Sequence, residues 1–197
     1  MGGPVRKGQS TRPSAIALKA TRRSAVVPSK DIFVALDFET ADQYRDSACS
    51  IALVRVEGGR VVKRAHYLIR PPRQTFVFTY IHGIRWSDVA KKPAFDELWP
   101  DVKGLLDGAN FIAAHNATFD ASVLNACCCK AELKAPPHPF VCTVKLARSA
   151  WGIFPTKLPD VCRHLGLKLD HHNALSDAEA CAGIVIAARK AGVTVFQ

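Results

Sequence analysis

The stretch IFVALDFET occupies residues 32–40 and sets the starting point for the rest of the chain. Its first five residues form an uninterrupted apolar run, which predicts a buried β-strand. Asp37 and Glu39 follow at a spacing of two, and side chains at that spacing point to the same face of a strand. The stretch therefore predicts a pair of carboxylates about 7 Å apart on a rigid element.

Two more carboxylates stand near the beginnings of predicted helices. Asp120 begins an amphipathic helix expected over residues 118–130, after a strand-like stretch at residues 110–114. Asp177 opens the strongest helix signal of the chain, over residues 175–191. A carboxylate in a first turn is favoured by the helix dipole.

A histidine precedes the last of these carboxylates. His172 stands five residues before Asp177, and five helical residues turn about 500°, so the two side chains cannot share one face of a straight helix. We therefore expect His172 on the loop before the helix, where it can fold back over the same site.

Four carboxylates and one histidine suit hard divalent cations. Mg²⁺ and Mn²⁺ take oxygen ligands, and a two-metal site about 3.5–4 Å across stabilises the attacking and leaving oxygens of a phosphoryl displacement. Zinc prefers closed sets of cysteine or histidine. The chain has no Cys-x-x-Cys, and the side chains of the run at residues 127–129 diverge around a helix. The residues predict a site for two Mg²⁺ or Mn²⁺ ions.

Length and composition indicate one domain. At 197 residues and 48% hydrophobic composition, the chain can bury one core but not two. No apolar run approaches the ~20 residues of a membrane span, so we expect a soluble protein without a membrane partner. Seven cysteines, an odd number without a framework pattern, favour a reducing compartment, and we expect a cytoplasmic protein.

Positive charge is concentrated at the N-terminus. Residues 1–30 hold seven basic and no acidic side chains, so +7 of the net +10 lies there. We predict a basic, disordered tail over residues 1–30 and a catalytic domain over residues 31–197. The tail could bind nucleic-acid phosphates, act only as a solubilising segment, or serve as a mitochondrial transit peptide.

The order of predicted elements indicates an α/β fold. Two β-rich runs are separated by the hairpin signal EGGR at residues 57–60, and strand-helix alternation follows. Three antiparallel strands followed by such alternation imply a mixed five-stranded sheet flanked by helices. Besides the elements already named, we expect strands at residues 48–56, 61–69 and 140–142. We also expect helices at residues 95–106, 143–150 and 158–164.

Three motifs in this order carry a family resemblance. They are LDFET at residues 36–40, HNATFDASVL at residues 115–124 and HHNALSDAEA at residues 171–180. With these motifs, residues 31–190 resemble the DEDDh-type, DnaQ-like 3′→5′ exonucleases, a family that includes the proofreading epsilon subunit of DNA polymerase III and free-standing relatives. The resemblance implies a ribonuclease-H-like architecture. Intervening stretches resemble the family too: IHGI at residues 81–84, CT at residues 142–143 and LPDVC at residues 158–162.

The resemblance also implies roles for single residues. The metal ligands would be Asp37, Glu39, Asp120 and Asp177, and His172 would take a proton from the attacking water. His171 is adjacent and competes for that role, but the family spacing His-x-Ala-x-x-Asp selects His172.

Contacts to substrate are expected from five residues near the motifs: Phe38, Thr40, His82, His115 and Asn116. Structural alternatives exist for most of them. Phe38 could pack beneath the site, His82 could be an ordinary loop histidine, and His115 with Asn116 could hydrogen-bond the loop that presents Asp120. Ala41 departs from the family, in which many members carry a second threonine, and the departure bears on contacts to the terminal nucleotide.

We therefore expect a hydrolase, a metal-dependent 3′→5′ exonuclease that acts on single-stranded or frayed DNA ends and releases nucleoside 5′-monophosphates. An RNA-trimming exoribonuclease is the alternative within the enzyme class, because the 2′-OH is read by local contacts. A non-catalytic polymerase accessory or nucleic-acid-binding subunit is the alternative outside it. A DNA polymerase is a candidate partner, but the chain stops just after its last predicted helix, which favours a free-standing enzyme.

Overall fold

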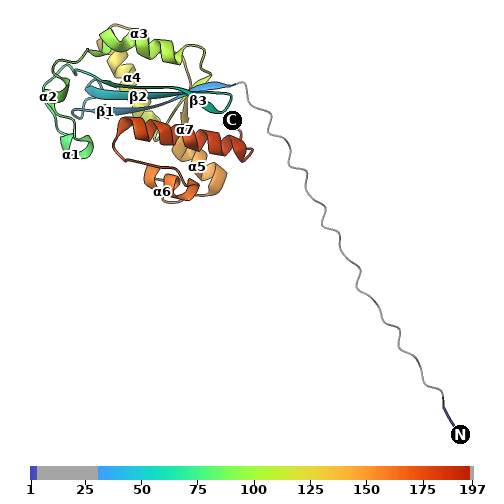
Figure 1. Ribbon diagram of the computed structural model, residues 1–197. Coiled ribbons are helices and arrows are strands. Elements are labelled where there is room, and N and C mark those ends of the chain that lie inside the picture. The colour runs from blue at the N-terminus through green and yellow to red at the C-terminus, as the bar shows by residue number, and fades with distance from the viewer. Residues whose placement is uncertain (4–30, 196–197) are drawn as a thin grey trace.

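One mixed sheet organises the domain. The computed structural model describes residues 1–3 and 31–195, in which five strands pair in the order β3-β2-β1-β4-β5 (Figure 1). This confirms the predicted five-stranded, ribonuclease-H-like sheet. The strands are β1 (Ile32–Thr40), β2 (Ala48–Glu57), β3 (Arg60–Leu68), β4 (Phe111–Ala114) and β5 (Phe140–Cys142).

The strand directions follow from the connections. β1, β2 and β3 are antiparallel neighbours, whereas β4 runs parallel to both β1 and β5. The predicted hairpin turn joins β2 to β3, and Gly58 and Gly59 in it have φ of 56° and 76°. Glycine adopts positive φ at little cost, so the EGGR signal gives the tight turn that it predicts.

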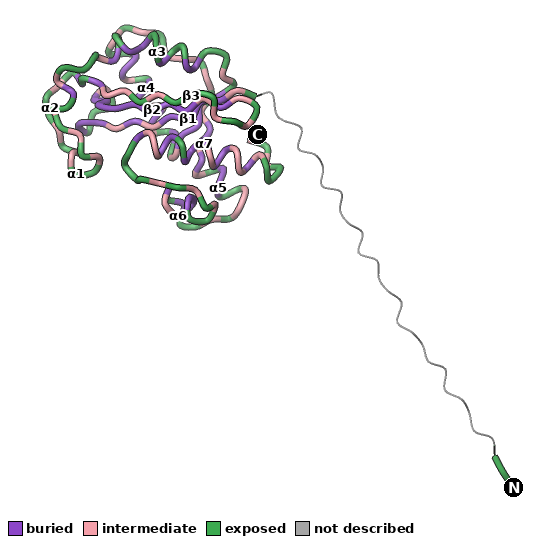
Figure 2. The backbone as a smooth tube through the Cα atoms, viewed as in Figure 1, coloured by how far each residue is buried: buried purple, intermediate pink, exposed green. Residues whose placement is uncertain are grey.

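Helices cover both faces of the sheet. In Figure 1, α3 and α4 lie on one side and α5, α6 and α7 lie on the other, and Figure 2 shows the buried residues following the strands between them. The helices are α1 (Thr79–His82), α2 (Trp86–Val89), α3 (Phe95–Leu106), α4 (Thr118–Lys130), α5 (Thr143–Trp151), α6 (Leu158–Leu165) and α7 (Ala174–Lys190).

The apolar run of β1 serves both cores at once. Phe33 and Ala35 pack in the cluster formed with α5, α6 and α7, whereas Val34, Leu36 and Phe38 pack in the cluster formed with α3 and α4. Each of the larger side chains among them stabilises the fold by about 1.5–3 kcal/mol when fully buried. A strand buried on both faces is therefore a rigid support for whatever follows it.

The expected elements agree with the observed ones to within about two residues, and α3, α4 and β5 have the expected bounds. The two helices α1 and α2 were not expected from the sequence. Each has four residues, and one helical turn is too short for the 3.6-residue periodicity to be recognised.

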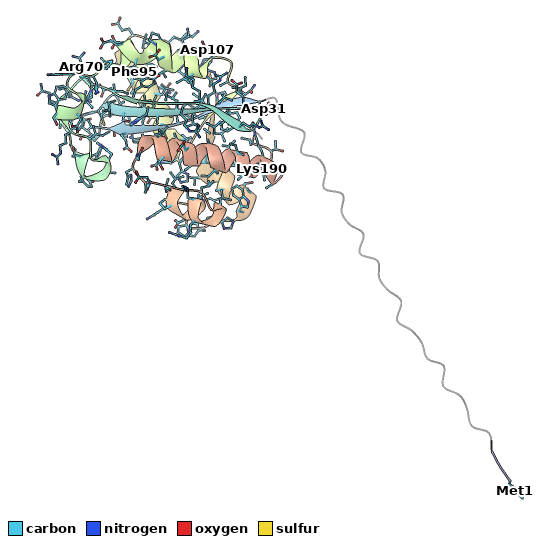
Figure 3. All side chains as sticks on the ribbon, in the orientation of Figure 1. Met1, Asp31, Arg70, Phe95, Asp107 and Lys190 are labelled. Atoms are coloured by element: carbon cyan, nitrogen blue, oxygen red, sulfur yellow. The ribbon has the colours of Figure 1, made fainter. Side chains whose placement is uncertain are left out.

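The start of the domain is tied to its last helix. Arg189 of α7 donates through Nη2 to Oδ2 of Asp31 at 3.0 Å, and its guanidinium lies over the stacked rings of Phe33 and Phe111. Figure 3 labels Asp31 and Lys190 at the same end of the sheet, where β1 begins. The carboxyl ends of β1 and β4 lie at the opposite end.

Residues 4–30, the greater part of the predicted basic tail, fall outside the described residues, as do residues 196–197. Within residues 31–195, no helix is long and apolar enough to cross a bilayer. All seven cysteines are free thiols, and Cys129 is exposed.

Candidate active site

The first two carboxylates project from the carboxyl end of β1. Asp37 and Glu39 continue the alternation of Phe33 and Ala35, so they lie on the face of the sheet that α7 covers. Both line a cavity of about 470 Å³. β2 pairs with β1 at both residues, and β4 pairs with residues 33–35 just before them, which restricts the movement of the pair.

Asp120 reaches the same place from the first turn of α4. Its side chain is 2% exposed, and its Oδ1 accepts a hydrogen bond from the backbone N–H of Phe38 at 3.2 Å. Burial raises the pKa of Asp120 to about 8, although this hydrogen bond opposes the shift. The contact holds the carboxylate of α4 against the strand that carries Asp37.

Asp177 lies in the first turn of α7 and is 4% exposed. Its Oδ2 accepts from the backbone N–H of His172 at 3.2 Å and lies 3.1 Å from Nδ1 of His171. Its Oδ1 is buried, and no residue of the described part of the chain hydrogen-bonds to it. Burial raises the pKa of Asp177 despite the two histidines.

The four carboxylates repel one another. Burial, followed by the charges of Asp120, Asp177 and Glu39, raises the pKa of Asp37 well above its usual range. Burial and then the charge of Asp177 raise the pKa of Glu39 to about 8. The site therefore disfavours its own negative charge in the absence of a cation.

Two adjacent histidines border this carboxylate group on the loop before α7. The rings of His171 and His172 stack with centroids 3.8 Å apart, and both line the cavity. Burial, and then the neighbouring His171, lower the pKa of His172. A lowered pKa keeps the imidazole neutral, which is the form that accepts a proton.

His82 holds the end of β1 in place. Its Nε2 bonds to the carbonyl of Thr40 at 3.2 Å and must carry the proton, because a carbonyl only accepts. Its Nδ1 accepts from the N–H of Ile84 at 3.1 Å. Both ring nitrogens are thus used within the protein, although His82 and Thr40 line the cavity.

Both ring nitrogens of His115 are also hydrogen-bonded within the protein. Its Nε2 donates to the carbonyl of Thr156 at 3.0 Å, so its neutral Nδ1 accepts from the hydroxyl of Thr143 at 2.9 Å. Arg148 donates to the Thr156 hydroxyl at 2.9 Å. His115 thereby joins the end of β4 to α5 and to the loop before α6.

Of the remaining candidates for substrate contact, Phe38 lines the cavity and Asn116 does not. Phe38 lines the cavity but is only 3% exposed, because its side chain packs in the core beside α3 and α4. Asn116 has φ of 62° and belongs to the turn before α4, where its carbonyl accepts from Phe119. Asn116 is exposed and does not line this cavity.

Several cavity residues were not expected from the motifs. Phe78 directly precedes α1 and Ile81 lies within it. Phe119 lies in α4, Lys157 directly precedes α6, and Leu158 begins it. Lys157 is the only lysine or arginine that lines the cavity within the described residues. Three quoted motifs touch this wall: IHGI contains Ile81, HNATFDASVL contains Phe119 and LPDVC begins at Leu158. None of them includes Phe78 or Lys157.

The donors fit a divalent cation. Within residues 31–195, no lysine or arginine forms an ion pair with Asp37, Glu39, Asp120 or Asp177. Oxygen donors suit Mg²⁺ and Mn²⁺, and the buried Oδ1 of Asp177 needs a partner. A positive ion would offset the mutual repulsion.

Several known proteins are similar to this chain. A family model described as Exonuclease, of the RNase T type, matches residues 34–185. The chain is 34% identical over 158 residues to DNA polymerase III PolC-type of Thermotoga maritima, covering 78% of this chain and 12% of that protein. It is 32% identical over 145 residues to exodeoxyribonuclease 10 of Escherichia coli strain K12, covering 69% of this chain and 59% of that protein. The chain thus spans about an eighth to three fifths of these relatives.

Solved structures show the same fold. Exonuclease X in complex with 5′-overhanging duplex DNA aligns with a TM-score of 0.68 at 28% identity, over 84% of this chain and 96% of that one. The nuclease domain of 3′hExo, a DEDDh family member bound to rAMP, aligns with a TM-score of 0.70 at 19% identity, over 81% and 92% of the two chains.

Proposed function

The chain belongs to the DEDDh-type exonuclease family, and from this premise we propose that it is a divalent-metal-dependent 3′→5′ exonuclease. Its substrate is the 3′ end of single-stranded or frayed DNA, and its products are nucleoside 5′-monophosphates.

The observation that carries this proposal is the group of four carboxylates: Asp37, Glu39 and Asp177 line one cavity, and Asp120 is hydrogen-bonded to the backbone of Phe38 beside them. Each of them has a raised pKa, and no lysine or arginine of residues 31–195 forms an ion pair with them. Such a group is costly to bury for structural reasons alone. Binding of cations would account for burying these four carboxylates together.

Exonucleases of this family generally use divalent metal ions. We propose that Asp37, Glu39, Asp120 and Asp177 hold two Mg²⁺ or Mn²⁺ ions. When bound there, the ions supply charge stabilisation to the attacking and the leaving oxygen of the phosphodiester.

His172 is the proposed general base. It lines the cavity, and the pKa shift caused by its burial favours the neutral imidazole. It removes a proton from the water that attacks the terminal phosphorus. The bond from phosphorus to the 3′ oxygen of the penultimate nucleotide then breaks, that oxygen takes up a proton from solvent, and the terminal nucleotide leaves with its 5′-phosphate.

The cavity wall supports a nucleotide as the group that is bound. At about 470 Å³ it lies in the range of small-ligand sites. Phe78, Ile81 and Phe119 supply apolar surface for a base, and Lys157 supplies one positive charge for a phosphate. Asp37, Glu39 and Asp177 line the same cavity, so a base held by the apolar wall places its phosphate near them.

The similarity to exonuclease X favours DNA as the substrate of this chain. Exonuclease X is 28% identical to this chain, and its solved structure contains duplex DNA. The PolC-type relatives suggest a DNA polymerase as a partner, although the match covers 12% of the Thermotoga maritima protein. The free-standing form is our proposal over a polymerase subunit, and the match to exonuclease X, over 96% of that chain, is the comparison that favours it.

The test uses matched DNA and RNA oligomers, each labelled at the 3′ or at the 5′ end, with Mg²⁺, Mn²⁺ or EDTA. Immediate release of 3′-labelled mononucleotide, a shortening 5′-labelled ladder and no reaction in EDTA are expected on DNA. Asp37→Asn serves as the inactive matched control. Preferential cleavage of RNA would identify an exoribonuclease, and binding without cleavage would identify an accessory subunit.

A further inference from the structure

We propose that His171, His172 and Asp177 form a second metal site, selective for a transition-metal ion such as Zn²⁺, and that its occupation switches the exonuclease off. The metal binding stands on the geometry of these three residues alone. Only its consequence for catalysis rests on the proposed function.

The three side chains are already gathered. One ligand atom from each lies within 4.8 Å of the others, and Nδ1 of His171 is 3.1 Å from Oδ2 of Asp177. Two ligands of a tetrahedral zinc ion, each about 2.0–2.1 Å from the metal, are about 3.3 Å apart. Small rotations of the two rings therefore suffice to close the set.

The backbone brings the two imidazoles together. Side chains of consecutive residues normally diverge, yet the rings of His171 and His172 stack at 3.8 Å. His172 has φ of 68°, in the left-handed region that non-glycine residues rarely occupy. This conformation turns both rings toward the start of α7, where Asp177 lies.

The donor atoms distinguish this set from the carboxylate group. Two imidazole nitrogens and one carboxylate oxygen are a familiar zinc set, with a fourth position left for water. Mg²⁺ takes oxygen ligands and gives up its waters reluctantly, so it has little affinity for paired imidazoles. The same three residues thus favour the transition metal.

The three residues are accessible to a metal ion and keep a donor atom without a partner. His171 and His172 are exposed, so an ion can enter from solvent, while Asp177 is buried and keeps an unpartnered Oδ1. By contrast, both ring nitrogens of His82 and of His115 are used in hydrogen bonds. Among the histidines that line the cavity, only the adjacent pair is available for a metal.

The two sites share residues, and this creates the switch. Asp177 is a proposed ligand of the catalytic ions and His172 is the proposed base, so a zinc ion on this set removes both from the reaction. His171 has no proposed part in hydrolysis. It is the residue that adds zinc affinity to the active site.

The binding experiment titrates Zn²⁺ alone into the full chain by calorimetry, with Co²⁺ as a spectroscopic probe of tetrahedral ligation. The variant His171→Ala removes one ligand and is expected to raise the dissociation constant for Zn²⁺ at least about 10-fold. His171→Asn, which keeps a hydrogen-bond donor beside Asp177, is expected to lose the same affinity. The exposed residues provide the controls His164→Ala and Cys129→Ser, which are expected to bind as the wild type does.

Asp120→Asn separates the two sites in the same titration, because it alters the carboxylate group and leaves the histidine set complete. Retained Zn²⁺ binding in Asp120→Asn and lost binding in both His171 variants support the proposal. Equal binding in the wild type and the His171 variants, or binding that depends on Asp120 and not on His171, overturns it.

The activity experiment adds Zn²⁺ at fixed saturating Mg²⁺, with each variant normalised to its own zinc-free rate. The wild type is expected to be inhibited, and the His171 variants are expected to need about 10-fold more Zn²⁺ for the same inhibition. Equal sensitivity of all variants overturns the switch. A chain that cleaves no substrate contradicts the proposed function, while the calorimetric result still decides the metal site.

Discussion

The backbone N–H of Phe38 donates a hydrogen bond to Oδ1 of Asp120 at 3.2 Å and thereby joins β1 to α4 across 82 residues of sequence. An intramolecular hydrogen bond contributes about 0.5–1.5 kcal/mol. After burial, the charge of Asp120 is the largest influence on the pKa of Asp37. The contact thus helps to place two proposed metal ligands side by side.

The four carboxylates predict complete dependence on a divalent cation. Asp37→Ala and Asp177→Ala are expected to abolish hydrolysis, because each removes a ligand that supports charge stabilisation in the transition state. Release of labelled nucleotide measures the loss, and circular dichroism checks that each variant is folded. Full activity in EDTA or in either variant would be incompatible with the metal assignment.

Repulsion among the carboxylates predicts that the site costs stability when no metal is bound. Asp37→Asn is expected to raise the midpoint of thermal unfolding in EDTA, by about 2–4 °C for each kcal/mol of repulsion that is removed. Mg²⁺ should stabilise the wild type and have less effect on this variant. The matched control is Asp101→Asn, on the exposed face of α3, which should change neither quantity. A fall in the midpoint for Asp37→Asn would show that the carboxylate has a structural role.

The choice between the adjacent histidines is tested by their alanine variants. His172→Ala is expected to lower turnover roughly 10²–10⁴-fold, the usual contribution of general-base catalysis. His171→Ala is expected to lower it much less. Since burial lowers the pKa of His172, the acid limb of the wild-type pH profile should lie below the unperturbed value of about 6.5 and vanish in His172→Ala. The opposite ranking would make His171 the base.

A charged network holds the loop after β1. Arg73 donates through Nε to Asp42 and through Nη1 to Asp46, both at 3.0 Å. Burial alone would raise the pKa of Asp42, but its hydrogen bonds, that with Arg73 first, lower it, and the hydrogen bond with Arg73 lowers the pKa of Asp46. Both carboxylates therefore stabilise the fold above the unfolded value of about 3.9, and this stability is lost as the pH falls through their folded pKa values.

Arg73→Gln should consequently lower the free energy of unfolding by about 1–3 kcal/mol at pH 7. The difference from the wild type should shrink as the carboxylates become protonated below pH about 4. Urea unfolding at both pH values measures it. Arg163→Gln, which removes the more exposed ion pair with Asp160, should change the free energy by less than about 1 kcal/mol. A pH-independent cost in Arg73→Gln would indicate lost packing instead of lost charge.

The seven basic residues of the tail predict a salt-dependent contribution to nucleic-acid binding. Each phosphate contact on a single strand contributes about 0.7 to the slope of log affinity against log salt, so deleting residues 1–30 should flatten the slope by up to about 5. Replacing the seven basic residues with glutamine should have the same effect at unchanged length, and turnover at saturating substrate should be preserved. An unchanged slope would assign the tail a targeting or solubilising role.

The sequence by itself determined most of the helices and strands and supplied the residue types of the proposed site. An apolar run, two amphipathic helices and a glycine turn are local patterns, so their periodicity and spacing predicted the sheet and the larger helices without knowledge of the contacts between them. Asp37, Glu39, Asp120 and Asp177 were recognisable because each stands at the end of such an element. Only the one-turn helices α1 and α2 were too short to be predicted.

The tertiary structure decided which side chains share the cavity and what each is free to do. Phe78, Phe119 and Lys157 line it because α1, α4 and α6 converge there, and no local pattern encodes that convergence. The ring nitrogens of His82 and His115 are occupied by partners from distant segments, whereas the left-handed backbone at His172 stacks two histidines beside Asp177. Residue types can be read along the chain, but hydrogen-bond partners, burial and pKa shifts arise only when remote segments pack together.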